Sequence, residues 1–362
     1  MAKKTLITDG GIYHKAKKAF ITVDGAYRKV KKGFLTVGGI FKQIFGGGEL
    51  SYYGTATALS AARYDLAATT VGNYALFGGG NTNGSTVDAY DKALTRSIPT
   101  ALSVARRKLA ATTIGDYALF GGGRSSGSVV DAYDKALTRN TPTPLSVGRY
   151  ELKATTVGSY AIFGSGPTGD GFTTMDIYDT SLTRMTPITL SATMQNYGAT
   201  TVGNYALFGG LSGVNAYDTS LTYTQATPLS IPRLGLQATT VGNYALFGGG
   251  YTTSPTTRHS TVDAYDKALT RSTQTALSVA RENLAATTIG DYALFGGGQQ
   301  GSSNWYNTTD AYDTSLTRTT PTALSAARYS LAATTIGDYA LFGGGQQSSS
   351  SYYDTVDVYQ VS

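Results

Sequence analysis

The chain has 362 residues, with 45 glycines, 27 tyrosines and only 14% charged residues, a composition that favours short strands and tight turns over helices. It has no cysteine and only two histidines, His14 and His259, which excludes disulfides, thiol nucleophiles, thiolate metal sites and any metal site of three histidines from one chain. No apolar run has the length of a signal peptide core or a membrane span. The net charge of +6 lies in residues 1–50, which hold ten of the 29 Lys and Arg residues.

The first segment, residues 1–45, repeats with a period of about 14 residues: LITDGGIYHKAKKA from Leu6, FITVDGAYRKVKKG from Phe20 and FLTVGGIFKQIF from Phe34. Each copy predicts two strands joined by an Asp-Gly or Gly-Gly turn. Its lysines are typical of exposed strands kept soluble, with contact to nucleic acid or an acidic partner as the less favoured interpretation.

Three small hairpins cannot build a substantial core of their own. Their aromatic side chains therefore need a surface that covers them, and the candidates are Phe20, Tyr27, Phe34, Phe41 and Phe45. We predict either a docking or oligomerisation module or a meander packed on the rest of its own chain. Residues 46–50 form a Gly-rich linker.

From residue 51 to 362 the motif LSxxRxxLxATTxGxYAxFGGG occurs seven times, with substitutions in the third and fourth copies. The spacing of about 39–48 residues is typical of propeller blades. The copies begin at Leu59, Leu102, Leu145, Leu190, Leu229, Leu277 and Leu324. In the first copy, strands are predicted over residues 66–71, 74–79, 86–91 and 95–102. Four antiparallel strands repeated radially make a β-propeller.

The two ends of this region predict how the ring closes. The last copy has three strand signals, ending at residue 361, and no fourth. Residues 55–60, TATALS, match the end of the fourth strand in other copies, such as PTALS at residues 99–103. We therefore predict an all-β fold: a seven-bladed propeller closed by an N-terminal outer strand and preceded by the hairpin leader.

The strand ends carry a resemblance to the Kelch family, whose units have an apolar strand ending in Gly-Gly, then Tyr-Asp, then Trp. Gly78-Gly79 with Tyr90-Asp91 follow this pattern, as do Gly121-Gly122 with Tyr133-Asp134 and Gly296-Gly297 with Tyr312-Asp313. The Trp is missing from that position in every copy. The chain thus resembles Kelch propellers over about 310 residues, which implies a binding scaffold and no particular activity.

Loops between the second and third strands vary far more than the strands and contain many Ser, Thr, Asn, Gln, Gly and Tyr residues. This amino-acid composition is typical of binding surfaces, and aromatic side chains in the loops could stack on a sugar ring. The alternative is that these side chains fold back over neighbouring blades. The predicted ligand-binding residues on this face are Trp305, Tyr306, Tyr251, Tyr352, Tyr353, Phe172 and Arg258.

An arginine recurs at the same motif position in six copies and is replaced by Met194 in the remaining one. A ring of cations for an anionic ligand is one interpretation, and ties between blades are the favoured one, because the residue repeats in nearly every copy. The six are Arg63, Arg106, Arg149, Arg233, Arg281 and Arg328. The recurring aspartates at Asp88, Asp131, Asp176, Asp263, Asp310 and Asp357 are likewise interpreted as structural.

The sequence predicts no enzyme, no cofactor and no metal. Kelch-like copper oxidases need a Cys–Tyr crosslink and histidine ligands, and propeller sialidases carry Asp-box turns; neither set is present. The main acidic candidates lie in different repeats, which argues against a paired-carboxylate glycosidase: Asp65, Glu151, Asp170, Glu282 and Asp354.

The hairpin repeats resemble N-terminal segments of bacteriophage virion proteins. The first hypothesis is therefore a virion appendage or receptor-binding protein, made in the host cytoplasm, whose residues 1–50 dock to other virion proteins or to further copies of the chain. Its propeller would bind a host-surface glycan or protein. The alternatives are a cytoplasmic Kelch-like protein-interaction scaffold and, third, a glycan-processing enzyme.

Overall fold

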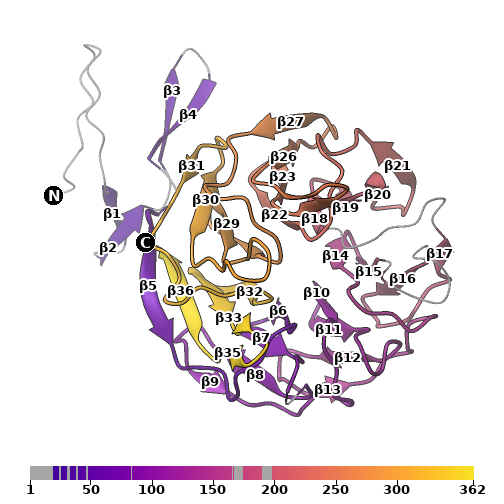
Figure 1. Cartoon of the computed structure of the whole chain (residues 1–362). Helices are drawn as coiled ribbons and strands as arrows, with labels where there is room; N and C mark the ends of the chain where they lie inside the picture. Colours follow the sequence, from indigo (N-terminus) through magenta and orange to yellow (C-terminus); the bar gives the residue numbers. More distant parts are fainter. Residues whose placement is uncertain are drawn as a thin grey trace.

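The computed structural model describes residues 48–82, 84–164, 166, 174–189 and 198–362, and the backbone of four strands within residues 19–45. These residues form strands and no α-helix, and hence no helix that could cross a membrane. Seven four-stranded antiparallel sheets stand as blades around one axis (Figure 1). The predicted seven-bladed β-propeller is thus confirmed.

The first four blades each use consecutive strands. Blade 1 contains β6 (Ala67–Val71), β7 (Tyr74–Gly78), β8 (Val87–Tyr90) and β9 (Arg96–Ser97), and blade 2 contains β10 (Ala110–Ile114), β11 (Tyr117–Gly121), β12 (Val130–Tyr133) and β13 (Arg139–Asn140). Blade 3 contains β14 (Ala154–Val157), β15 (Tyr160–Phe163), β16 (Thr174–Asp179) and β17 (Ile188–Thr189), and blade 4 contains β18 (Gly198–Val202), β19 (Tyr205–Gly210), β20 (Gly213–Asp218) and β21 (Tyr223–Ala226).

Blades 5 and 7 contain a small hairpin between their second and third strands. Blade 5 contains β22 (Gln237–Val241), β23 (Tyr244–Gly248), β26 (Val262–Tyr265) and β27 (Arg271–Gln274), with the hairpin β24 (Tyr251–Thr253) and β25 (Thr256–Arg258). Blade 6 contains β28 (Ala285–Ile289), β29 (Tyr292–Gly296), β30 (Thr309–Asp313) and β31 (Arg318–Thr319). Blade 7 contains β32 (Ala332–Ile336), β33 (Tyr339–Gly343), β36 (Val356–Val361) and β5 (Leu50–Ala56), with the hairpin β34 (Gln346–Ser348) and β35 (Ser351–Tyr352).

The N-terminal strand β5 closes the ring, as predicted. It pairs antiparallel with the C-terminal strand β36, with Val356 opposite Ala56 and Val361 opposite Leu50. The pairing continues beyond both strands, because Glu49 N donates to Ser362 O at 3.0 Å. The last blade therefore has its full four strands, and no outer edge is left on β36.

Seven apolar clusters fill the spaces between neighbouring blades, and together they form the core. The glycines of the FGGG motif make room for this packing. A Cβ on Gly78 would lie 2.7 Å from the Phe120 ring of the next blade. The same contact recurs around the ring, for example between Gly121 and Phe163 and between Gly343 and Phe77. In each of these pairs, the phenylalanine ring of one blade packs directly against the glycine backbone of the neighbouring blade.

The Ala-Thr-Thr sequence of the inner strands joins the blades near the axis. The first Thr of each blade shares a hydroxyl–hydroxyl hydrogen bond with the second Thr of the next blade. The seven pairs are Thr69–Thr113, Thr112–Thr156, Thr155–Thr201, Thr200–Thr240, Thr239–Thr288, Thr287–Thr335 and Thr334–Thr70. These fourteen hydroxyls, here called the threonine girdle, form a closed circle across all seven interfaces.

Two of the predicted leader hairpins are present as paired strands. β1 (Ala19–Val23) pairs with β2 (Ala26–Val30), and β3 (Gly33–Val37) pairs with β4 (Ile40–Phe45), both antiparallel. The first predicted hairpin lies outside the described residues.

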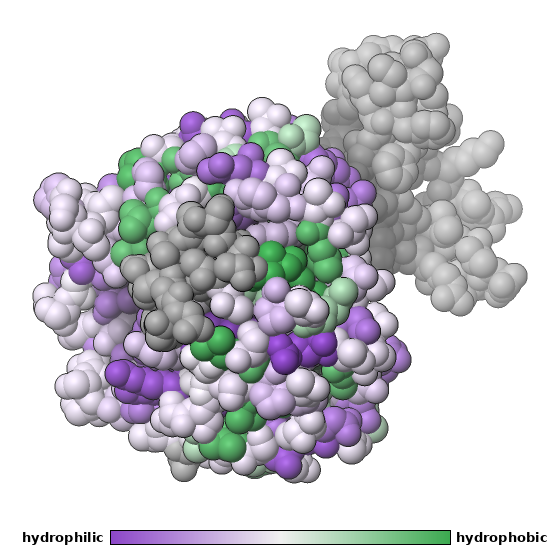
Figure 2. All heavy atoms as spheres, turned by 90° about the vertical axis from the view of Figure 1, so that its right-hand side faces the viewer, coloured by the Kyte–Doolittle hydropathy of each residue, from purple (hydrophilic) through white to green (hydrophobic). Residues whose placement is uncertain are grey.

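The side of the propeller is a mixed surface. Figure 2 shows hydrophilic and hydrophobic residues interspersed over its coloured part. The exposed large apolar side chains come from different parts of the ring: Tyr53, Ile98, Val104, Met185, Leu211 and Tyr223. The described side chains therefore point to no single apolar docking face.

Candidate functional site

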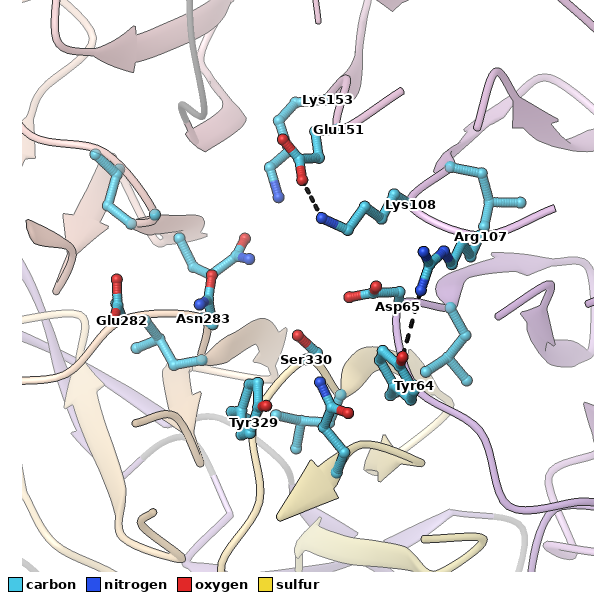
Figure 3. Close-up of a pocket in the computed structure, with 18 of the residues that line it drawn as sticks. Tyr64, Asp65, Arg107, Lys108, Glu151, Lys153, Glu282, Asn283, Tyr329 and Ser330 are labelled. Carbon is cyan, nitrogen blue, oxygen red and sulfur yellow. Dashed lines mark hydrogen bonds and ion pairs between the residues drawn. The ribbon is translucent and has the colours of Figure 1, made fainter. Parts of the chain in front are cut away.

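A pocket lies at the propeller axis, where the chain crosses from the outer strand of one blade to the inner strand of the next (Figure 3). Its volume is about 470 Å³, within the range of roughly 300–1,000 Å³ found for small-molecule sites. Crossing segments from six blades line it, together with Arg124, Tyr251 and Gln346 from loops between second and third strands. The two kinds of loop that the sequence places on one face thus meet here.

One residue of each described crossing segment adopts a left-handed backbone conformation. These residues, here called the axial ring, have φ values between 53° and 64°: Asp65, Lys108, Glu151, Gly235, Asn283 and Ser330. Backbone hydrogen bonds join neighbours along the ring, for example Lys108 N to Asp65 O at 2.8 Å and Asp65 N to Ser330 O at 3.0 Å. The axial ring fixes the crossing segments to one another while their side chains line the pocket.

Glycine would be the ordinary choice for this backbone conformation, since other L-residues adopt it at a cost of about 1–2 kcal/mol. In the axial ring only Gly235, of the described members, is a glycine. The others carry a carboxylate, an amine, an amide or a hydroxyl. Strained positions of this kind cluster at ligand sites, and here they place a different polar group in each blade.

A second layer of the pocket lies two residues farther along each chain crossing. At this position the copies carry Ala67, Ala110, Lys153, Gly198, Gln237, Ala285 and Ala332. Small residues leave space around the axis, and only Lys153 and Gln237 are polar. Both are half-buried and line the pocket.

The charged groups of the pocket are partly neutralised by each other. Lys108 Nζ forms an ion pair with Glu151 (Figure 3), and Arg258 forms one with Glu282 at 2.9 Å. Burial raises the pKa of the Asp65 carboxyl, against the opposing effect of Lys108. Burial lowers the pKa of the Lys153 amine, against the opposing effect of Glu151 and then Asp65.

Three polar side chains of the pocket have no partner among the described residues. The Lys153 amine and the amides of Gln237 and Asn283 form no side-chain hydrogen bond or ion pair there. In Figure 3, Lys153 and Asn283 lie on different sides of the same cavity. The pocket therefore offers the Lys153 amine and two amides without a partner, beside the guanidinium groups of Arg107 and Arg124.

Aromatic side chains form part of the rim. Arg107 Nη1 donates to Tyr64 Oη at 3.3 Å and to Asn81 Oδ1 at 3.2 Å. The Tyr64 ring lies 5.0 Å from that of Tyr352. Burial raises the pKa of the Tyr329 phenol, which also lines the pocket.

The six recurring arginines lie inside the blades and do not line the pocket. Each is at most 2% exposed and pairs with the recurring aspartate, for example Arg63 Nη2 with Asp88 Oδ2 at 2.6 Å and Arg281 Nη2 with Asp310 Oδ2 at 2.8 Å. The same arginines reach a carbonyl of the second strand, as Arg281 does with Phe295 O at 3.1 Å. The anion-ring interpretation is therefore corrected: these cations are enclosed by protein groups.

The predicted ligand-binding residues are divided among several places. Tyr251 lines the pocket, and the Cζ atom of Arg258 lies over its ring, 5.9 Å from the ring centre. Tyr352 contacts the rim through Tyr64, and Tyr353 lies 5.9 Å from the Arg328 guanidinium.

The remaining predicted ligand residues do not line the pocket. Trp305 and Tyr306 are half-buried in the loop of blade 6, where Tyr306 Oη donates to Gln300 Oε1 at 2.8 Å. Phe172 lies outside the described residues. The same is true of the side chains of Phe20, Tyr27, Phe34, Phe41 and Phe45, so docking through the leader stays a prediction.

Sequence reasoning treated the acidic residues as scattered, and the structure brings three of them together. Asp65, Glu151 and Glu282 come from blades 1, 3 and 6 and line one pocket. Lys108, Lys153, Gln237 and Asn283 were not predicted. The available signal was the three variable positions inside the otherwise repeated RxxLxATT segment, two of which supply the two layers of the pocket.

No protein-family model matches the chain, and no curated protein matches its sequence. A solved structure with the same fold is a fungal alcohol oxidase of the AA5 family in complex with copper. It matches with a TM-score of 0.68 and 14% sequence identity, over 87% of this chain and 76% of that chain. At this identity the likeness establishes the fold.

This finding overturns the functional interpretation drawn from the sequence. The propeller that the chain resembles is that of an oxidase. The interpretation as a phage appendage, a host-receptor binder or a Kelch-like scaffold is therefore wrong. Physically, the charged residues of different blades converge in the axial pocket, which that interpretation did not consider.

The copper of the oxidase has no counterpart in the residues of this chain. Without cysteine and with only two histidines, the chain lacks soft and imidazole ligands in the number that copper prefers. The described residues contain no group of three His, Cys, Asp or Glu side chains that could hold a metal ion. The pocket residues thus do not fit a copper centre.

Proposed function

We propose that the chain is a binding protein that holds a small polar ligand with an anionic group in the axial pocket. The observation that supports this most is the axial ring, in which five described residues other than glycine accept a left-handed backbone and line one cavity with polar side chains. The left-handed backbone does not itself require these polar side chains, because Gly235 adopts the same conformation without a side chain.

The charge of the lining favours an anionic group on the ligand. The lining contains Arg107, Lys108, Arg124 and Lys153 against Asp65, Glu151 and Glu282. Arg258 compensates Glu282 from outside the pocket, and Lys108 compensates Glu151. The Lys153 ammonium group has no ion-pair partner, and a bound anion would compensate for the hydration that this group loses on burial.

We propose binding without a chemical step. The described lining contains no cysteine and no histidine, and its single serine, Ser330, has a neighbouring carboxyl group, Asp65, in place of a histidine base. The carboxylates of Glu151 and Glu282 are held in ion pairs. Among the acidic residues of the described lining only Asp65 is outside an ion pair, and no histidine or cysteine accompanies it as a base or nucleophile.

Calorimetric titration of the full chain with D-gluconate, D-glucose and inorganic phosphate tests the proposal. At least one probe is expected to bind, and the triple variant Lys153→Ala, Gln237→Ala, Asn283→Gly is expected to lose that binding. The new residues already stand at the equivalent positions of other blades, as Ala67, Ala110 and Gly235, so the fold should tolerate them. Lys92→Ala, in a turn between third and fourth strands, is the matched control and should bind like the parent. Absence of binding by all three probes, or unchanged binding by the triple variant, would refute the proposal.

A further inference from the structure

The unpaired side chains of the axial pocket have two different chemistries. Lys153 presents a single ammonium group from blade 3, whereas Gln237 of blade 5 and Asn283 of blade 6 present neutral amides. None of the three has a partner among the described residues. A ligand that satisfies all three must combine a charged end with a neutral hydrogen-bonding part.

The charged end is best matched by a carboxylate. Lys153 contributes one charge, and Lys108 is occupied by Glu151. Of the nearby arginines, Arg107 donates through Nη1 to Tyr64 and Asn81, and the exposed Arg124 lies 5.3 Å from the centre of the Tyr150 ring. A phosphate dianion would bring a second negative charge into the pocket, where the carboxylates of Asp65 and Glu151 would repel it.

The neutral part is best matched by hydroxyl groups. Each amide offers a donor and an acceptor side by side, and a hydroxyl is the simple group that both donates and accepts. Gln237 and Asn283 lie in the sector of the pocket where Glu282 is neutralised by Arg258. The hydroxyl of Ser330 and the phenol of Tyr329 extend the same uncharged surface (Figure 3).

We infer that the ligand of the axial pocket is a polyhydroxylated carboxylate, such as a sugar acid, with its carboxylate on Lys153 and its hydroxyls on Gln237 and Asn283. This inference rests on the proposed function, since it assigns a ligand class to the same site. A carboxylate at Lys153 would also offset the burial that lowers the pKa of its amine. The cavity of about 470 Å³ is large enough for a six-carbon acid.

The test compares D-gluconate with three probes that each lack one feature: D-glucose has no charge, acetate has no hydroxyls, and inorganic phosphate has a different anion. In calorimetric titrations of the full chain, gluconate is expected to bind at least about tenfold more tightly than each of the others. Lys153→Ala should reduce gluconate binding to the level of glucose. Gln237→Ala with Asn283→Gly should weaken gluconate about tenfold or more while leaving acetate unchanged.

The outcomes separate this inference from the proposed function. Pocket-dependent binding of glucose or phosphate that equals or exceeds that of gluconate would overturn the sugar-acid assignment and leave the binding function standing. Equal gluconate affinity in the parent and in Lys153→Ala would also overturn it. No pocket-dependent binding by any probe would refute both. Denaturant midpoints equal to that of the parent show that each variant is folded, and Lys92→Ala serves as the unaffected control.

Discussion

A buried arginine connects each of six blades to the chain segment that enters it. In blade 6, Arg281 forms an ion pair with Asp310, which also accepts from Arg318 Nη1 at 2.8 Å and from Ser278 N at 2.9 Å. The aspartate is fully buried, and so is Arg281. Such a pair contributes little net stability against an apolar replacement of both partners, but removing Arg281 alone leaves the buried Asp310 carboxylate with only the partly exposed Arg318 as a cationic partner.

Arg281→Met should therefore be strongly destabilising. It removes the 2.8 Å ion pair with Asp310 and the hydrogen bond to Phe295 O, and we expect a loss of about 3–5 kcal/mol in the free energy of unfolding. Arg318→Met, which removes the partly exposed second cation, should cost about 1–2 kcal/mol. Urea denaturation of the two variants and the parent measures both values. Equal losses in the two variants would contradict the role assigned to Arg281.

At the scale of the elements, the repeated strand sequences predict most of what holds the blades together. Thr156 of β14 illustrates the point: its hydroxyl donates to Thr113 O at 2.5 Å and pairs with Thr112 Oγ1 at 2.9 Å, both in β10. The β-branched Ala-Thr-Thr sequence indicates an inner strand, but only the arrangement of the blades reveals the threonine girdle. Valine would satisfy the β-strand preference of this position but would form neither of these hydrogen bonds.

Thr156→Val should destabilise the protein although the side chain keeps its shape. The carbonyl of Thr113 and the hydroxyl of Thr112 lose their partner in a half-buried layer, and we expect a loss of about 1–3 kcal/mol. Thr156→Ser keeps the hydroxyl and should recover most of this loss. Thr138→Val, at an exposed threonine, should stay within about 0.5 kcal/mol of the parent. Chemical denaturation of the three variants provides the comparison; a loss in Thr156→Val no larger than in Thr138→Val would show that the girdle is dispensable.

The fold could be predicted from the sequence because seven near-copies fix strand length, turn position and closure. The pocket could not be predicted in this way, because its polar lining residues stand at positions that differ from one repeat to the next. Lys153 and Gln237 stand where other copies have Ala or Gly, and Asp65, Lys108 and Asn283 stand at a position whose residue type differs from copy to copy. Their convergence depends on the radial arrangement of the blades, which brings residues more than 200 positions apart to one axis.

At the scale of the whole molecule, the ring depends on the strand that joins its two ends. β5 contributes Leu50 and Tyr52 to the apolar cluster shared by blades 6 and 7, and Ala56 packs against the cluster between blades 7 and 1. Tyr52 Oη donates to Asp357 at 2.6 Å, and burial together with this bond raises its pKa to about 12. Without β5, strand β36 would present an unpaired edge and two core clusters would open.

Deletion of residues 1–56 should therefore destroy the cooperative unfolding of the propeller. An exposed outer edge is a template for pairing with other chains, so we expect a lower melting temperature, a broader transition and aggregation. Deletion of residues 1–47 removes the leader strands but keeps β5, and it should melt like the parent. Circular dichroism on heating, with light scattering on the same samples, measures both effects. If the chain without residues 1–56 melts as sharply and at the same temperature as the chain without residues 1–47, β5 is not needed for closure, and the three remaining strands of blade 7 are sufficient to seal the ring.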